Sequence, residues 1–244
     1  MIMNNRIGFY ISILTGTATV ITFIVAYLTE PLSGPFCVGS CFKYPYLDMV
    51  LRFPADYIWM YCAIVWLLLY IIFMTCIHRQ ADSEKKTFSQ VGLSFAIMSA
   101  LILLANYFIQ LSVVQPSLLN GEFDGIALIT QYNPHGIFIA LEELGFILMG
   151  VSFLFMAPVF SKSRLERVIR SIFIGSFVLT LITFILISIF YGINREYRFE
   201  VAVMSINWLT LIVSGILVGT MFKRSWNLTK VCSEASLLET SQKS

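Results

Sequence analysis

Six long apolar runs decide what this chain can fold into. A helix needs about 20 apolar residues to cross the roughly 30 Å hydrocarbon layer of a membrane, and each run is long enough. Lipid offers the backbone no hydrogen bonds, so such segments form helices or a closed barrel. Barrel strands alternate in polarity and these runs do not. The sequence therefore predicts an all-α integral membrane protein, a six-transmembrane-helix bundle. The predicted spans cover residues 7–28, 57–77, 91–114, 136–160, 171–191 and 201–222.

The charged residues predict the orientation of this bundle. Only 12% of the side chains are charged, against roughly 25% in soluble domains. Of the 16 Lys and Arg residues, 12 fall on the side that holds both termini and 4 on the other side. Because basic residues are retained in the cytoplasm, both termini are predicted to be cytoplasmic, in a plasma or inner cell membrane. Residues 1–222 form the membrane domain, and the polar residues 223–244 are predicted to be a mobile cytoplasmic tail.

Two long loops, 29–56 and 115–135, lie on the predicted outer side. Cys37 and Cys41 are four residues apart on this oxidising side, which predicts a disulfide. The two histidines are predicted on opposite faces, so the thiols lack partners for a metal site, and neither a metal nor a cofactor is expected. Residues 44–54 are bracketed by prolines and predict a short amphipathic helix, either a surface anchor or a lid over an outward cavity.

Two adjacent acids, Glu142 and Glu143, are the most informative residues of the spans. If the apolar layer starts near Gly136, they lie about 9–11 Å below the outer boundary. Carboxyl groups at that depth face the bundle interior and suggest a function, here ligand binding or proton carrying. The alternative is that residues 144–160 alone span the membrane and that both glutamates lie in water.

Amides and hydroxyls on other spans fall at a similar depth. Side-chain amides are poorly tolerated in lipid unless they are hydrogen-bonded. The predicted layer therefore either lines an outward-facing polar cavity or forms a buried hydrogen-bond network that fixes helix packing. It comprises Thr22, Asn106, Gln110, Glu142, Glu143, Thr183 and Asn207. His135, at the entrance to the fourth span, is a candidate proton relay or a plain interfacial residue.

Gly215 and Gly219 have the spacing of a close helix–helix contact. Such a contact serves either packing within the bundle or a homodimer. Membrane lipid is the other expected partner. Nucleic acid is not expected, because the basic residues are too scattered to form a binding surface.

Three classes of function are compatible with these features. The first is a non-enzymatic multi-pass membrane protein that binds, and could transport, a small amphipathic or cationic ligand, with Asn106, Gln110 and Asn207 orienting it. The second is a structural or accessory bundle that packs against a partner protein. The third is an intramembrane lipid-modifying enzyme that uses the carboxylates and His135. It ranks last because the sequence contains no nucleophile–base motif, and no catalytic residue is assigned.

Overall fold

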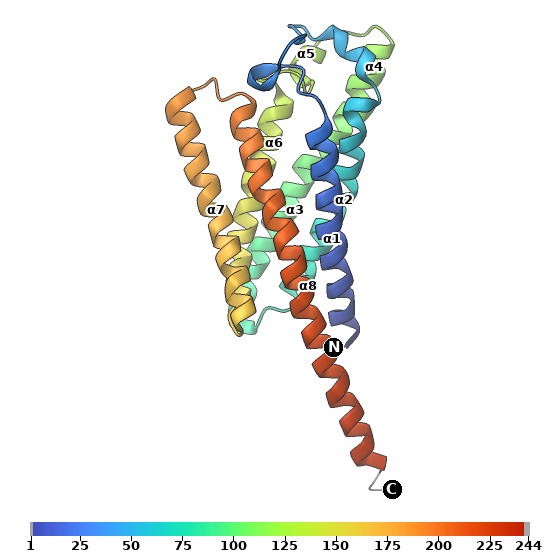
Figure 1. The fold of residues 1–244 in the computed structure, drawn as a ribbon, viewed down its shortest axis with the longest axis vertical. Coiled ribbons are helices and arrows are strands. Elements are labelled where there is room, and N and C mark those ends of the chain that lie inside the picture. Colours follow the sequence, from blue (N-terminus) through green and yellow to red (C-terminus); the bar gives the residue numbers. More distant parts are fainter. Residues whose placement is uncertain (1, 242–244) are drawn as a thin grey trace.

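The computed structural model describes residues 2–241, with the backbone alone for residues 2, 3 and 230–241, and the regular secondary structure of this part of the chain is entirely helical. Six of them are long and apolar enough to cross a membrane, which confirms the predicted six-helix fold. They are α1 (Ile2–Leu28), α2 (Ile58–His78), α3 (Lys86–Ile109), α6 (Ile137–Met156), α7 (Arg164–Tyr191) and α8 (Tyr197–Ser241). All six run along the long axis of the molecule (Figure 1).

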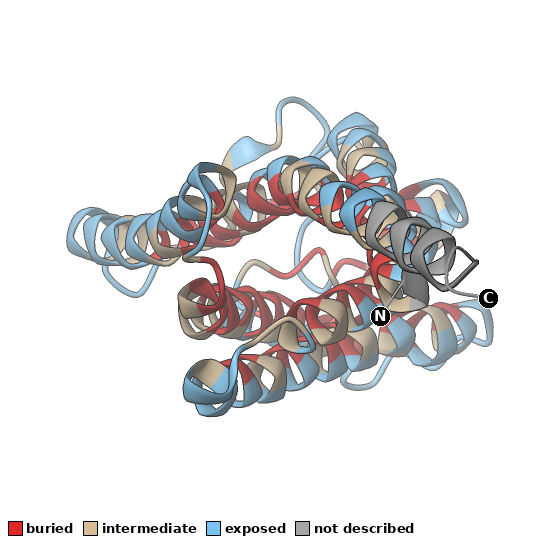
Figure 2. Ribbon diagram, turned by 90° about the horizontal axis from the view of Figure 1, so that it is seen from below, coloured by how far each residue is buried: buried red, intermediate tan, exposed pale blue. Residues whose placement is uncertain are grey.

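Five of these helices form a closed ring. α1 packs against α2, α2 against α3, α3 against α6, α6 against α8, and α8 returns to α1. α7 packs on α6 and α8 and stands outside the ring (Figure 1). The buried residues lie on the helix faces that turn toward the interior (Figure 2). We call the end with the N-terminus and the C-terminal part of α8 the terminal end, and the opposite end the loop end.

Aromatic rings fill the middle of the ring of helices. The ring of Trp66 on α2 lies 6.4 Å from that of Phe146 on α6 and 5.9 Å from that of Trp208 on α8. The rings of Phe146 and Trp208 are 6.3 Å apart, so the three side chains pack on one another. All three are fully or almost fully buried. The three rings thus occupy the middle of the bundle at this level.

The tightest helix contact joins α1 to α8. A Cβ atom at Gly215 would lie 2.9 Å from the carbonyl oxygen of Ser12 and 3.0 Å from the Cα of Gly16, so only glycine fits there. A Cβ atom at Gly219 would meet the side chain of Ile13 at 3.1 Å. Both glycines thus face α1 of the same chain, and a homodimer through them stays a prediction.

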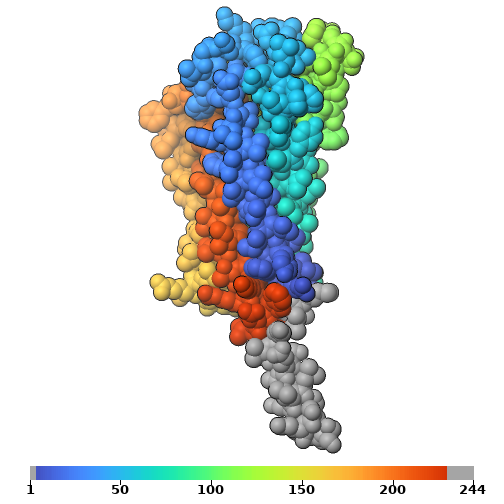
Figure 3. Space-filling model, turned by 45° about the vertical axis from the view of Figure 1, so that its right-hand side comes forward, coloured from blue at the N-terminus to red at the C-terminus, as the bar shows by residue number. Residues whose placement is uncertain are grey.

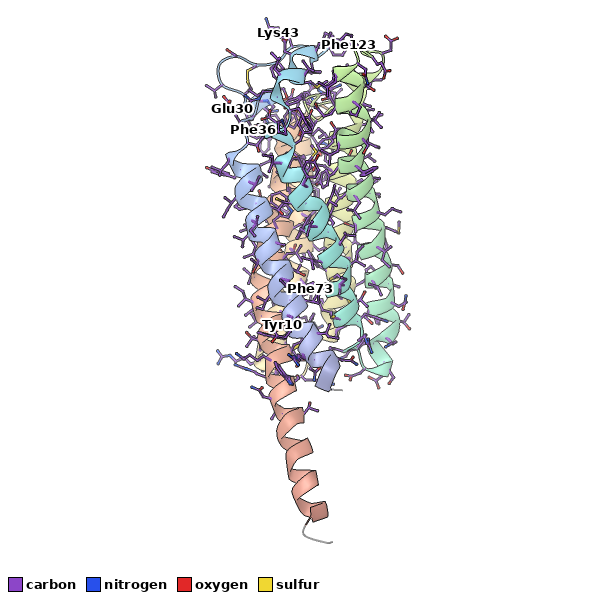
Figure 4. All side chains as sticks on the ribbon, turned by 90° about the vertical axis from the view of Figure 1, so that its right-hand side faces the viewer. Tyr10, Glu30, Phe36, Lys43, Phe73 and Phe123 are labelled. Carbon is purple, nitrogen blue, oxygen red and sulfur yellow. A yellow bond between two sulfur atoms is a disulfide. The ribbon has the colours of Figure 1, made fainter. Side chains whose placement is uncertain are left out.

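Long loops with short helices cover the loop end. The helices are η1 (Gly34–Phe36), η2 (Leu47–Arg52), η3 (Ala55–Tyr57), α4 (Gln115–Leu119) and α5 (Ile126–Ile129), and the π-helical turn η5 (Gln110–Val114) joins α3 to α4. Figure 3 shows the first loop lying over the ends of α1 and α2. Cys37 and Cys41 form a disulfide in this loop, with their Cα atoms 5.9 Å apart (Figure 4). The predicted amphipathic segment contains η2, whose Met49 packs on the second loop.

Two 3-10 turns, η4 (Ser83–Lys85) and η6 (Ala157–Val159), lie at the terminal end. Here α8 differs from its predicted span, because the helix does not end at Phe222 but continues to Ser241. No Gly or Pro occurs between residues 220 and 241, so nothing in that stretch stops the helix. Of the predicted tail, residues 242–244 lie outside the described residues. The mobility of the tail and the cytoplasmic side of both termini stay predictions.

Candidate functional site

A cavity of about 520 Å³ lies at the loop end, between α1, α6 and α8. Most of its wall is apolar, and a large part of it is aromatic. The rings that line it belong to Phe23, Tyr27, Phe36, Trp59, Tyr132, Phe138, Tyr197 and Trp208. Glu30 lines it as well, and both Glu30 and Phe36 lie beyond the loop end of α1 (Figure 4). Trp208 belongs to the aromatic cluster as well, so that cluster closes the cavity toward the terminal end.

Two carboxyl groups from different helices meet in the wall of this cavity. Glu142 on α6 is 1% exposed and Glu200 on α8 is 7% exposed. Both residues line the cavity, and their side chains are neighbours there. The hydroxyl group of Tyr107 on α3 donates a hydrogen bond of 2.6 Å to Oε1 of Glu142. Tyr107 is fully buried behind the wall, so this hydrogen bond fixes the carboxyl group from the side opposite the cavity.

A third carboxylate, Asp56 in η3 directly before α2, borders the cavity near the loops. Unlike the other two it has a cation beside it. The guanidinium group of Arg52 donates two hydrogen bonds of 2.9 Å to it, and the hydroxyl group of Tyr132 donates one of 2.6 Å. The hydrogen bond to Asp56 raises the pKa of Arg52. Burial, and next the hydrogen bond to Asp56, raise the pKa of Tyr132, so its hydroxyl group stays a donor at neutral pH. The negative charge of Asp56 is therefore balanced by Arg52 within the protein.

The segment that follows α1 forms the roof of the cavity. The hydroxyl groups of Ser33 and Tyr197 share a hydrogen bond of 2.7 Å, and the Tyr197 hydroxyl group lies 3.0 Å from the carbonyl oxygen of Gln131. Gly34 has φ +67°, and its Cα packs on the ring of Tyr197, where a larger residue has no room. These contacts hold the first loop against the start of α8.

Glu142 is the one residue among the six predicted ligand or proton-carrying residues that lines this cavity. Its neighbour Glu143 points to the α7–α8 loop, where Arg195 lies 3.0 Å from its carboxylate. The guanidinium group of Arg195 also lies 4.8 Å from the centre of the Phe184 ring, so the pair joins α6 to α7. The side chain of His135 is exposed, and its backbone N–H donates to the side chain of Asn133.

The three predicted amides donate to backbone carbonyl groups instead. Asn106 donates a hydrogen bond of 2.9 Å to the carbonyl oxygen of Phe138, and Asn207 donates one of 3.2 Å to that of Phe146. Gln110 bonds to the backbone of the second loop through both its oxygen and its nitrogen. Thr22 donates to the carbonyl oxygen one turn earlier in α1, and Thr183 lies on α7, outside the ring. The predicted layer is thus divided between a cavity acid and a packing network.

Glu200 and Asp56 belong to this site but were not predicted from the sequence. The predicted sixth span began at residue 201, so Glu200 was assigned to a loop. One signal was available: Glu200 precedes the buried Asn207 by seven residues, which places both on the same face of a helix. For Asp56 the sequence offered the i, i+4 spacing to Arg52, which predicts an ion pair but not a cavity.

No protein-family model matches this sequence, and neither curated proteins nor solved structures give a match. Among residues 4–229, whose side chains the structure describes, no three His, Cys, Asp or Glu side chains gather as metal ligands would. Function is therefore inferred from the cavity and its carboxyl groups.

Proposed function

We propose that this multi-pass membrane protein is non-enzymatic and binds a small amphipathic cation in the cavity at the loop end. The observation that carries the proposal is the buried carboxyl group of Glu142, beside that of Glu200, in a wall made mostly of aromatic and aliphatic side chains. A charge in such surroundings is screened less than in water, so a carboxylate there attracts a cation strongly. Aromatic faces add cation–π attraction, and the apolar wall takes up the body of the ligand.

Binding is a simpler proposal than passage through the bundle. The cavity ends at Trp208, which packs on Trp66 and Phe146. A transported ligand would have to separate these three rings. We therefore place the ligand at the loop end and assign no exit at the terminal end.

The proposal is tested with purified full-length protein in detergent and radiolabelled tetraphenylphosphonium, a cation enclosed by aromatic rings. We expect saturable binding that Glu142→Gln weakens at least about tenfold, because this change removes a counter-charge from a buried site. Glu143→Gln is the matched control, since Glu143 is the adjacent residue and pairs with Arg195 instead of lining the cavity. The affinity of Glu143→Gln for tetraphenylphosphonium should equal that of the parent protein.

A second variant covers the case in which Glu142→Gln does not fold. Ser205→Phe keeps all carboxyl groups and places a ring in the wall of the cavity, so it should weaken binding by filling space. Unchanged binding in a folded Glu142→Gln or Ser205→Phe protein would refute the proposal, as would an equal loss in Glu143→Gln.

A structural or accessory role is the second candidate. Two observations support it. The amides of Asn106 and Asn207 bond to a neighbouring helix and that of Gln110 to the second loop. None of the residues 181–191 of α7 is buried. A partner protein that packs on this half of α7 would give the same arrangement. Failure of the cation-binding test, together with a loss of stability in Glu142→Gln, would favour this role.

A further inference from the structure

A cluster of exposed arginines lies at the terminal end, on the first two turns of α7. Arg164, Arg167 and Arg170 all expose their side chains. Among the described residues none of the three forms an ion pair or a side-chain hydrogen bond. The arginines of the loop end differ, because Arg52, Arg195 and Arg198 are each paired with a carboxylate. Those pairs bring their charged atoms within 2.9, 3.0 and 3.2 Å, respectively.

The nearest acid does not neutralise this cluster. Glu166 turns its carboxylate to the preceding loop, where it accepts hydrogen bonds from the backbone N–H groups of Ser161 and Lys162 at 3.0 and 2.8 Å. Its own N–H donates to the side chain of Ser163, which caps the helix. The positive end of the helix dipole adds to the charge of the three guanidinium groups. The first turns of α7 therefore attract an anion from the surroundings.

A shallow groove runs along α7 beside these arginines. It is lined by Arg164, Arg167, Val168, Ser171 and Ile172. Two guanidinium groups and a hydroxyl group can donate hydrogen bonds to the oxygens of one phosphodiester, and guanidinium groups bind phosphate in a bidentate manner. The apolar side chains of Val168 and Ile172 lie on the side of the groove that leads toward the middle of the helix.

The same face of α7 continues as an apolar surface above the groove. Gly175 follows Ser171 by one turn, and a Cβ atom built there meets nothing within 4 Å. Leu179, Ile182 and Leu186 come next on this face and are 50%, 47% and 47% exposed. An acyl chain would fit along this strip, with its phosphate at the arginines. A free phosphate would leave the strip unused.

The geometry points to a binding site for an anionic phospholipid on α7, with the headgroup phosphate held by Arg164 and Arg167 and the acyl chains along the strip from Gly175 to Leu186. Arg170 adds charge at the edge of the site. The predicted orientation places these arginines in the cytoplasmic leaflet, where anionic lipids are common. This site is separate from the cavity at the loop end.

The test measures lipid retained by the purified full-length protein. The protein is exchanged into detergent with equal amounts of dioleoyl phosphatidylglycerol and dioleoyl phosphatidylcholine, and bound lipid is counted by native mass spectrometry. We expect phosphatidylglycerol to be preferred about tenfold by the parent, and this preference to be lost in the double variant Arg164→Gln/Arg167→Gln. Arg79→Gln/Arg224→Gln is the matched control, because it removes the same charge from exposed arginines at the same end that do not line the groove.

Three outcomes would overturn the inference. The parent has no preference for the anionic lipid; the control variant loses the preference to the same extent, which indicates diffuse charge; or soluble glycerol phosphate displaces the bound lipid, which indicates a site for the phosphate alone. Both variants must unfold at the temperature of the parent, and this is the expected result since the exchanged side chains are exposed.

Discussion

Replacing Gly215 with alanine tests the contact that closes the ring of helices. The new Cβ atom would lie 2.9 Å from the carbonyl oxygen of Ser12 and 3.0 Å from the Cα of Gly16. Both are backbone atoms, so no side chain can move aside and α1 and α8 must separate. Overpacking of this kind costs about 1–3 kcal/mol, and the better helix propensity of alanine returns up to about 1 kcal/mol. We expect Gly215→Ala to lower the free energy of unfolding by about 1–2 kcal/mol, or Tm by about 2–8 °C.

Two other glycines provide matched controls on the same chain. A Cβ atom at Gly175 meets nothing within 4 Å, so Gly175→Ala should raise Tm slightly through helix propensity alone. A Cβ atom at Gly219 meets the flexible end of Ile13 at 3.1 Å, so Gly219→Ala should have a small effect. Thermal unfolding in detergent, followed by tryptophan fluorescence, should give the highest Tm for Gly175→Ala, a lower one for Gly219→Ala and the lowest for Gly215→Ala.

A Gly215→Ala protein as stable as Gly175→Ala would refute this account of the α1–α8 contact. Sedimentation of the same variants also tests the predicted homodimer. If the glycines serve only the contact within one chain, the mass of the particle should not change.

Three further predictions concern polar contacts. Tyr107→Phe removes the hydrogen-bond donor of the buried Glu142 and should cost about 1–3 kcal/mol of stability, measured as a fall in Tm. Arg52→Gln leaves the buried Asp56 without a cation. Because Arg52 is one-third exposed, we expect a loss of about 2 kcal/mol of stability. Proteolysis of the first loop should also be faster, and an unchanged cleavage rate would contradict this. The hydrogen bond from Lys162 lowers the pKa of the Asp82 carboxyl group. This pair therefore stabilises the fold above the ordinary pKa of an aspartate, and the stabilisation is lost as the pH falls through the lowered pKa. Any Tm difference between the parent and Asp82→Asn should therefore vanish in acid.

The sequence predicted the six spans because the length of apolar runs depends on membrane thickness and on little else. It could not predict which helices touch. The pairing of α1 with α8 depends on Gly16 and Gly215 meeting at one height, and the pattern of small residues on each helix is also compatible with a dimer. The position of α7 outside the ring could not be predicted either, since its apolar run resembles those of the buried helices.

The site was predicted in part for a related reason. Depth alone identified Glu142 as a buried acid, but Glu143 lies at nearly the same depth and points to Arg195. Successive helical residues point about 100° apart, and only the rotation of α6 in the bundle decides which of the two enters the cavity. Glu200 was not predicted because the apolar run begins after it, although the helix extends past it toward the loops.

The contact between α1 and α8 also explains why the cavity lies at the loop end. At Gly16 and Gly215 the two backbones touch, whereas nearer the loops Phe23 and Trp208 stand between them with their rings 5.8 Å apart. The helices consequently diverge toward the loop end (Figure 1), and the cavity occupies the space between them. A side chain that forces them apart at Gly215 must also change the width of the cavity. Gly215→Ala should therefore alter the affinity for tetraphenylphosphonium as well as Tm, while Gly175→Ala, on α7, should change Tm alone. If Gly215→Ala lowers Tm and leaves the affinity unchanged, the cavity does not depend on this crossing.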